Sequence, residues 1–252
     1  GALAYKSRKK QVFLLFLKLL GLDKKINWHA TDKQERLDIQ HYFPRSKNIS
    51  LISNLPASVQ PTLEVPLKEA GKLHISFVSR VSPKKNLTFL LQALLIVETE
   101  VYLDIGGPIE SEVYWKSCQD LIKRMPSNVH ISYHGALKPD EVGQVLKKNH
   151  IFVLPTEGEN FGHAIFEALL LGKPVVISHL TPWQDLEENQ AGLLVSLDDP
   201  KVLAKHIEHF ASLNAPAYEK WAKGAWLYAK RFLEQSDLPN QYDQMFKNYG
   251  GE

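Results

Sequence analysis

Short apolar runs alternate with amphipathic stretches over residues 73–196. The apolar runs that we predict to be strands cover 73–79, 101–105, 129–133, 151–154, 174–178 and 193–196. The stretches between them that carry a helical period cover 87–97, 111–125, 139–149 and 163–171. Strands that alternate with helices of this length pair in parallel through right-handed crossovers. The pattern therefore predicts an α/β fold with a Rossmann-like parallel sheet and flanking helices.

The two ends of the chain follow a different pattern. Residues 1–55 contain only two α/β units, with helices predicted over 5–20 and 32–42 and strands over 26–30 and 49–53. Two strands do not make a stable domain by themselves. This segment therefore either packs onto the domain of the main sheet or is the remnant of an N-terminal domain.

Three prolines and the lack of any sustained period predict a linker over 56–71. We expect the main domain to cover 72–215. The residues after Pro200 have a helical pattern to the end of the chain, and we expect the helices of 216–252 to pack back toward the N-terminal segment.

Composition narrows the class of protein. The chain has 252 residues, of which 44% are hydrophobic and 23% charged, so it can bury a core and is not disordered. The net charge of +2 is too small for a general nucleic-acid binder, and only residues 1–25 are strongly basic. The single cysteine, Cys118, excludes an intramolecular disulfide and fits a reducing compartment, so we expect a cytoplasmic protein. The apolar run over 12–22 is about half the roughly 20 residues that a membrane-spanning helix needs.

A basic turn follows the first strand of the main domain. Ligands of open parallel sheets bind beyond the carboxyl ends of the strands, which makes the turns after the strands the places to inspect. Arg80, Lys84 and Lys85 precede a predicted helix start there, and fixed cations beside free helical N–H groups suit a phosphate or pyrophosphate. A solvated basic loop is the alternative interpretation.

A second turn leads into a helix that carries an isolated acid. Glu167 is surrounded along that helix by apolar residues, and no Lys or Arg stands three or four positions away. A carboxylate in such a place needs partners. These could be two adjacent hydroxyls of a ligand, such as a ribose, or a salt bridge that the fold supplies.

Glu159 lies eight residues earlier, on the loop that leads into this helix. The Asn160-Phe161-Gly162 turn that follows directs backbone N–H groups at whatever binds there, and Gly162 permits its close approach. The loop therefore predicts a hydroxyl-rich, negatively substituted ligand.

These residues carry a resemblance to a known family. Glu159 and Glu167 form an E-x7-E pattern within Glu-Asn-Phe-Gly, after an Ile-Phe-Val-Leu-Pro strand and before Gly-Lys-Pro-Val-Val. The pattern resembles the C-terminal, nucleotide-sugar half of the retaining GT-B-fold glycosyltransferases of family 4, also called glycosyl transferases group 1. The resemblance covers about residues 25–212, although Ser79 stands where a glycine is usual.

The resemblance implies a role for each site residue. The catalytic residues would be Glu159, Arg80 and Lys85. Glu159 would contact a hydroxyl of the transferred sugar, and Arg80 and Lys85 would neutralise the pyrophosphate and the departing nucleoside diphosphate. Glu167 would hold the ribose hydroxyls. The other donor-binding residues would be Asn160, Phe161 and Gly162 through backbone N–H groups, His163 facing the sugar, and Gly135 and Leu137 in a turn that contacts the base.

The family works without a divalent ion, so we expect no metal and no cofactor besides the nucleotide-sugar substrate. Asp198-Asp199 is interpreted as a helix cap before Pro200 rather than as a metal motif. The implied partners are the donor and a glycan or lipid-linked acceptor, with no nucleic acid. Peripheral contact with the inner membrane face through residues 1–25 is a secondary expectation.

A complete GT-B enzyme has two comparable domains, whereas only about 55 residues precede the linker here, against the roughly 150 of a typical domain. We therefore expect a fragment that binds donor but transfers little sugar alone. The alternatives are a sugar-nucleotide epimerase or phosphorylase of the same fold, and a noncatalytic module that binds a membrane or a partner.

Overall fold

The computed structural model describes residues 8–24, 26–31, 33–52, 62–63 and 65–249. The chain divides into two compact units, one of residues 1–55 with 233–252 and one of residues 56–232. Residues 56–61 and 64 of the predicted linker, and residues 1–7 of the basic segment, lie outside the described residues.

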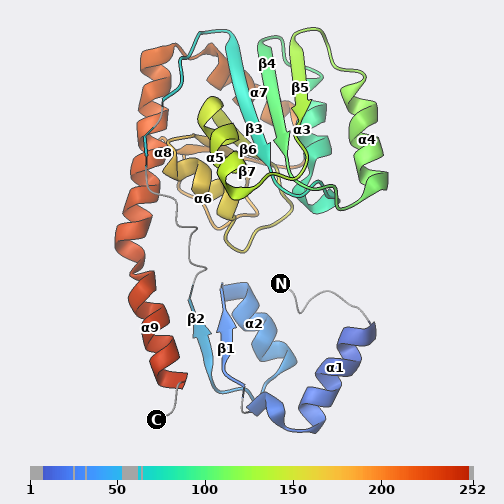
Figure 1. The fold of residues 1–252 in the computed structure, drawn as a ribbon, viewed down its shortest axis with the longest axis vertical. Helices are drawn as coiled ribbons and strands as arrows, with labels where there is room; N and C mark the ends of the chain where they lie inside the picture. Colours follow the sequence, from blue (N-terminus) through green and yellow to red (C-terminus); the bar gives the residue numbers. More distant parts are fainter. Residues whose placement is uncertain (1–7, 25, 32, 53–61, 64, 250–252) are drawn as a thin grey trace. The chain divides into compact units, whose positions relative to one another are not determined.

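The larger unit is built on a parallel sheet of six strands (Figure 1). Its strands are β3 (Lys72–Val78), β4 (Glu100–Gly106), β5 (Val129–Tyr133), β6 (Ile151–Leu154), β7 (Val175–Ser178) and β8 (Gly192–Val195). They lie in the order β5-β4-β3-β6-β7-β8, and every neighbouring pair is parallel. The predicted α/β fold class and its strands are confirmed.

The helices of this unit follow the strands in alternation. They are the one-turn 3-10 helix η2 (Pro83–Lys85), α3 (Leu87–Leu94), α4 (Glu112–Ile122), α5 (Pro139–Lys148), α6 (His163–Leu170), α7 (Pro200–Ser212) and α8 (Ala215–Ser236), whose residues from Leu233 onward group with the smaller unit. The Asp199 side chain caps α7 as predicted, because it accepts a hydrogen bond of 2.9 Å from the Lys201 N–H. The sequence did not predict η2, which is separated from α3 by Asn86 in the left-handed conformation.

Helices cover both faces of the sheet (Figure 1). α3 packs against α4 and α7 on one face, whereas α5 and α6 lie over the other. Strands enclosed in this way have no solvent face, which is why β6 is apolar and buried at each of its positions.

The direction of the chain through the sheet reverses between β3 and β6. From β3 the chain proceeds outward to β4 and β5, and it then returns to β6 and proceeds outward on the other side through β7 and β8. The loops that follow β3 and β6 therefore leave from adjacent strands but run to opposite faces. Such a switch point is the usual ligand crevice of an open α/β sheet.

The smaller unit has a two-stranded parallel sheet of its own. Its elements are α1 (Arg8–Leu19), η1 (Leu22–Lys24), β1 (Trp28–Ala30), α2 (Lys33–Tyr42), β2 (Ile49–Leu51) and α9 (Leu238–Tyr249). Trp28 stacks on Phe43 with ring centroids 4.6 Å apart, and Tyr242 of α9 meets the ring of His29 edge-on at 5.3 Å. None of the described helices is long and apolar enough to cross a bilayer.

Candidate functional site

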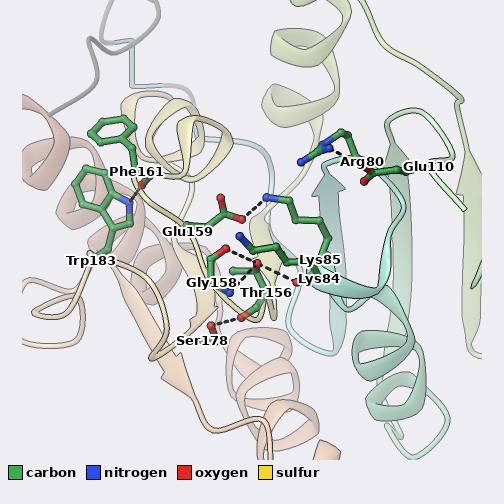
Figure 2. A network of polar contacts seen from close by, with 10 residues as sticks. All are labelled: Arg80, Lys84, Lys85, Glu110, Thr156, Gly158, Glu159, Phe161, Ser178 and Trp183. Carbon is green, nitrogen blue, oxygen red and sulfur yellow. Dashed lines mark hydrogen bonds and ion pairs between the residues drawn. The ribbon is translucent and has the colours of Figure 1, made fainter. Parts of the chain in front are cut away.

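The loops on either side of the switch point are tied together through one backbone carbonyl. The carbonyl of Lys84, in the loop after β3, accepts hydrogen bonds from the Thr156 hydroxyl at 3.1 Å and from the Glu157 N–H at 2.8 Å, both in the loop after β6. Thr156 is itself buried, and its own carbonyl accepts a bond from the Ser178 hydroxyl at the end of β7 (Figure 2). The ends of three neighbouring strands are thus held as one surface.

Lys85 and Glu159 form an ion pair on this surface. The Lys85 ammonium donates to a carboxylate oxygen of Glu159, and the two side chains point toward each other from the two loops (Figure 2). Each side chain is only 12% exposed, so water screens the pair weakly. The sequence predicted both residues as members of one site but did not predict that they would pair.

Arg80 has a different partner. Its guanidinium pairs with Glu110 at 2.8 Å, where the two side chains are 58% and 48% exposed. An exposed pair of this kind contributes little to stability, so the guanidinium can change partners at small cost. The structure therefore places Arg80 beside the site but does not bring it to Glu159.

Glu167 lies in the second turn of α6 and is half-buried. Burial raises the pKa of its carboxyl above the usual value. Within the described residues, no cation or hydrogen-bond donor pairs with this carboxylate. The described residues therefore do not form the internal salt bridge that the sequence left open. The Glu167 carboxylate keeps its capacity to accept hydrogen bonds from a ligand.

Gly162 starts α6 from a left-handed conformation, with φ of 82°. A Cβ added there would stand 2.7 Å from the Ile165 Cδ1, and the conformation itself disfavours other residues. His163 is exposed at the helix start, and its ring lies 5.0 Å from the ring of Phe161. Asn160 is partly exposed on the loop.

The turn after β5 joins the same edge of the sheet. The Gly135 carbonyl accepts a bond of 2.7 Å from the Gly107 N–H at the end of β4, and Gly135 itself has a φ of 72°. The Leu137 side chain fills the space over Gly106, where an added Cβ would stand 2.3 Å from the Leu137 Cδ1. The turn predicted to contact a base is therefore fixed to β4.

Trp183 supports the site, although no pattern in the sequence predicts this role. The indole N–H of Trp183 donates to the Phe161 carbonyl at 2.6 Å, and the indole packs among Phe161, Phe166 and Phe232. The segment 179–191 has neither helix nor strand, so no period marked Trp183. An isolated tryptophan between Pro182 and Gln184 is its only signal.

The strand order and the tied loops define a doubly wound α/β protein, and its candidate ligand site lies at the switch point. Residues 60–226 match the family model described as glycosyl transferases group 1, and the chain belongs to that family.

The relatives extend well beyond this chain. It is 22% identical over 183 residues to an uncharacterized 41.2 kDa protein in the cps region of Klebsiella pneumoniae, covering 71% of this chain and 47% of that protein. It is 30% identical over 172 residues to the O-antigen chain mannosyltransferase B of Escherichia coli, covering 66% and 41%. The chain thus spans less than half the length of these two relatives.

A solved structure confirms the fold class. The Anabaena HepE structure in complex with UDP and glucose superimposes with a TM-score of 0.70 at 18% identity, over 94% of this chain and 67% of that one. At this identity the likeness concerns the fold alone.

Proposed function

We propose that this chain binds a nucleotide-sugar donor and that the protein is a hexosyltransferase. It would move a sugar with retention to a glycan or lipid-linked acceptor in polysaccharide or glycolipid biosynthesis. The observation that carries the proposal is the half-buried Glu167 carboxylate, which keeps its acceptor capacity in the helix that follows the loop of the Lys85–Glu159 pair. The relatives support it, since the E. coli relative is an O-antigen mannosyltransferase and the HepE structure is a complex with UDP and glucose.

The chemistry of the site suits a nucleoside diphosphate as leaving group. Negative charge grows on the diphosphate as its bond to the sugar breaks, and the cations of Lys85 and Arg80 would stabilise that charge. Glu159 would accept a hydrogen bond from a sugar hydroxyl, and Glu167 would accept from both ribose hydroxyls. The turn of Gly135 and Leu137 would contact the base.

The cations of the chain also remove the need for a metal in the proposal. A divalent ion commonly neutralises a leaving diphosphate, and here Lys85 and Arg80 would do so. We therefore expect EDTA to leave donor binding unchanged. Loss of binding in EDTA, restored by Mg²⁺ or Mn²⁺, would contradict this part of the proposal.

Calorimetric titration tests the donor site. We expect the chain to bind at least one of UDP, GDP, ADP and TDP or their sugar conjugates. Glu167→Ala should weaken that binding by about 1.5–3 kcal/mol, since the lost bonds involve a charged acceptor. Glu157→Ala is a matched control, because Glu157 is an exposed acid of the neighbouring loop.

Two results would count against the proposal. Absence of binding by every nucleotide would contradict the donor site, and an unchanged affinity of Glu167→Ala would remove the ribose assignment. Conversion of the donor without an acceptor would point instead to an epimerase.

We further propose that the protein works in the cytoplasm and touches the inner membrane face through residues 1–25. The support is the basic sequence of this segment and the exposed apolar side chains of α1, among them Val12, Phe13 and Phe16. Sedimentation with anionic vesicles should show binding that weakens with salt. Equal binding to neutral vesicles would contradict the electrostatic part.

A further inference from the structure

The hydrogen bond from Trp183 fixes the orientation of one peptide unit in the donor loop. The Trp183 indole donates to the Phe161 carbonyl at 2.6 Å, and both side chains are buried. The peptide between Phe161 and Gly162 is trans, so its C=O and its N–H point in opposite directions. Because the carbonyl faces the indole, the Gly162 N–H must face away from it.

That N–H has no partner in the part of the chain that the structure describes. Gly162 is a buried residue, and none of the described residues accepts a hydrogen bond from its amide. Buried backbone donors without an acceptor are rare in folded proteins, because each one costs free energy. The orientation that Trp183 imposes therefore leaves a donor that water or a ligand must satisfy.

The surroundings of this N–H favour an anion. It immediately precedes the first turn of α6, whose first N–H groups have no acceptor within the helix and carry its positive dipole end. Lys85 supplies a cation to the same loop, where it is paired with the Glu159 carboxylate, and a phosphate would compete with that carboxylate for it. A phosphate oxygen fits a place with these neighbours better than an uncharged group.

We propose that Trp183 is a positioning residue of the donor site, which holds the Phe161–Gly162 peptide so that the Gly162 N–H donates to a phosphate oxygen of the nucleoside diphosphate. This inference rests on the proposed function and adds to it a residue that does not itself touch the ligand. If the peptide turned over, the site would lose this donor and the Phe161 carbonyl would repel the anion in its place. The indole N–H of Trp183 therefore raises the affinity for the diphosphate in two ways: it keeps the Gly162 N–H in the site and keeps the Phe161 carbonyl out of it.

The ring of Trp183 is not sufficient for this role. Phe161 already packs on Phe166 and Phe232, with ring centroids 5.6 and 5.9 Å apart, so other aromatic rings help to bury it. None of these rings can donate to its carbonyl. The role assigned to Trp183 thus belongs to its N–H, and a phenylalanine at the same position separates the N–H from the packing.

The chain offers a matched control in Trp226 of α8. Its indole nitrogen is buried but has no hydrogen-bond partner among the described residues. Trp226→Phe therefore removes an indole N–H that bonds to none of these residues, whereas Trp183→Phe removes one that holds the Phe161 carbonyl. Both variants make the same change of side chain.

The experiment measures the dissociation constants of UDP, GDP, ADP and TDP for the wild type and the two variants, at a temperature where all three are folded. We expect Trp183→Phe to weaken the diphosphate that binds by about tenfold, the usual effect of one hydrogen bond to a charged group. Trp226→Phe should stay within about twofold. Binding by the wild type with no loss in Trp183→Phe would overturn the positioning role while the proposed function stood. Absence of binding in the wild type would overturn the proposed function and this inference with it.

A second measurement needs no variant and covers the case in which Trp183→Phe does not fold. In the wild-type protein, the amide proton of Gly162 should move downfield in NMR spectra as the binding diphosphate is added, whereas that of Gly143 on α5 should not move. A Gly162 amide that stays in place while the ligand binds would overturn the inference.

Discussion

The Lys85 ammonium and the Glu159 carboxylate face each other across the switch point of the sheet and form an ion pair. The two residues are 74 positions apart and come from the loops after β3 and β6. A diphosphate that needs Lys85 must therefore compete with Glu159. Once Lys85 pairs with the phosphate, the Glu159 carboxylate is free to accept a hydrogen bond from a sugar hydroxyl.

This competition predicts that a substitution of Glu159 raises the affinity for a nucleoside diphosphate. Glu159→Gln should bind a nucleoside diphosphate without sugar more tightly, by roughly three- to tenfold, because Lys85 no longer has a charged partner to give up. The nucleotide sugar should gain less, since its hydroxyl loses a charged acceptor. Titration of both ligands measures the difference.

Glu157→Gln controls for the change in charge, because Glu157 is an exposed acid in the same loop. An equal gain in this control would show that long-range charge, rather than the pair, causes the effect.

Glu167→Gln should stabilise the chain while it weakens donor binding. Burial raises the pKa of the carboxyl in the folded state, so the ionised form is disfavoured by folding. The neutral glutamine should therefore raise the free energy of unfolding near pH 7.5. Because the wild-type group is protonated in both states at low pH, this advantage should vanish below the usual glutamate pKa. Urea unfolding of both proteins at several pH values checks the sign, and a variant that is less stable at pH 7.5 would contradict it.

The free energy of unfolding should fall at acidic pH because of His150. Its Nδ1 accepts from the His74 N–H at 2.9 Å and its Nε2 donates to the Leu67 carbonyl at 2.8 Å, so the ring is neutral. Burial lowers its pKa from 6.5 to about 4. The unfolded chain therefore binds more protons between these two values, and the free energy of unfolding should fall by about 3 kcal/mol as the pH falls through this window.

Urea unfolding between pH 4 and 8 measures this loss. His74 and His206 contribute in the same direction, because burial also lowers the pKa of each. The decisive comparison is His150→Asn, which should flatten the profile, against replacement of the exposed His179, which should not. Parallel profiles for the two variants would contradict the assignment to His150.

Two glycines should respond in opposite directions to alanine. A Cβ on Gly107 would stand 1.9 Å from the Ser79 carbonyl oxygen, and its φ of 138° is unfavourable for alanine. Gly107→Ala should therefore cost about 3 kcal/mol or more of unfolding free energy. Gly143→Ala meets no atom within 4 Å in helix α5 and should gain about 0.5–1 kcal/mol. Equal unfolding midpoints in urea would contradict the close approach between Gly107 and Ser79.

Local pattern was enough for the elements of this fold. The strands β6 and β7 are buried on both faces, so their continuous apolar runs could be found without any knowledge of their neighbours. Their order in the sheet could not be found in this way, because it depends on how the helices pack. The switch point between β3 and β6 is therefore a result of the structure.

The residues of the candidate site could be predicted from the sequence, but the ion pairs and hydrogen bonds between them could not. The sequence predicts Lys85, Glu159 and Glu167 as site residues, because charged side chains after buried strands or within an apolar helix need polar partners. The sequence pattern groups Arg80 with Lys85. In the structure, a bridge between Val81 and Ile109 holds the loop after β3 beside residues 109–110, and Arg80 therefore pairs with Glu110. Trp183 acts through its indole N–H on a distant carbonyl, and no local pattern marks such a contact.

The junction at Lys84 is made by a carbonyl oxygen, an atom common to all amino acids. Replacing the side chain at this position would leave both of its bonds intact, whereas Thr156→Val would remove one of them. A saturation mutagenesis screen should thus tolerate most changes at 84 and few at 156. The position would look dispensable in such a screen although the crevice is assembled around it.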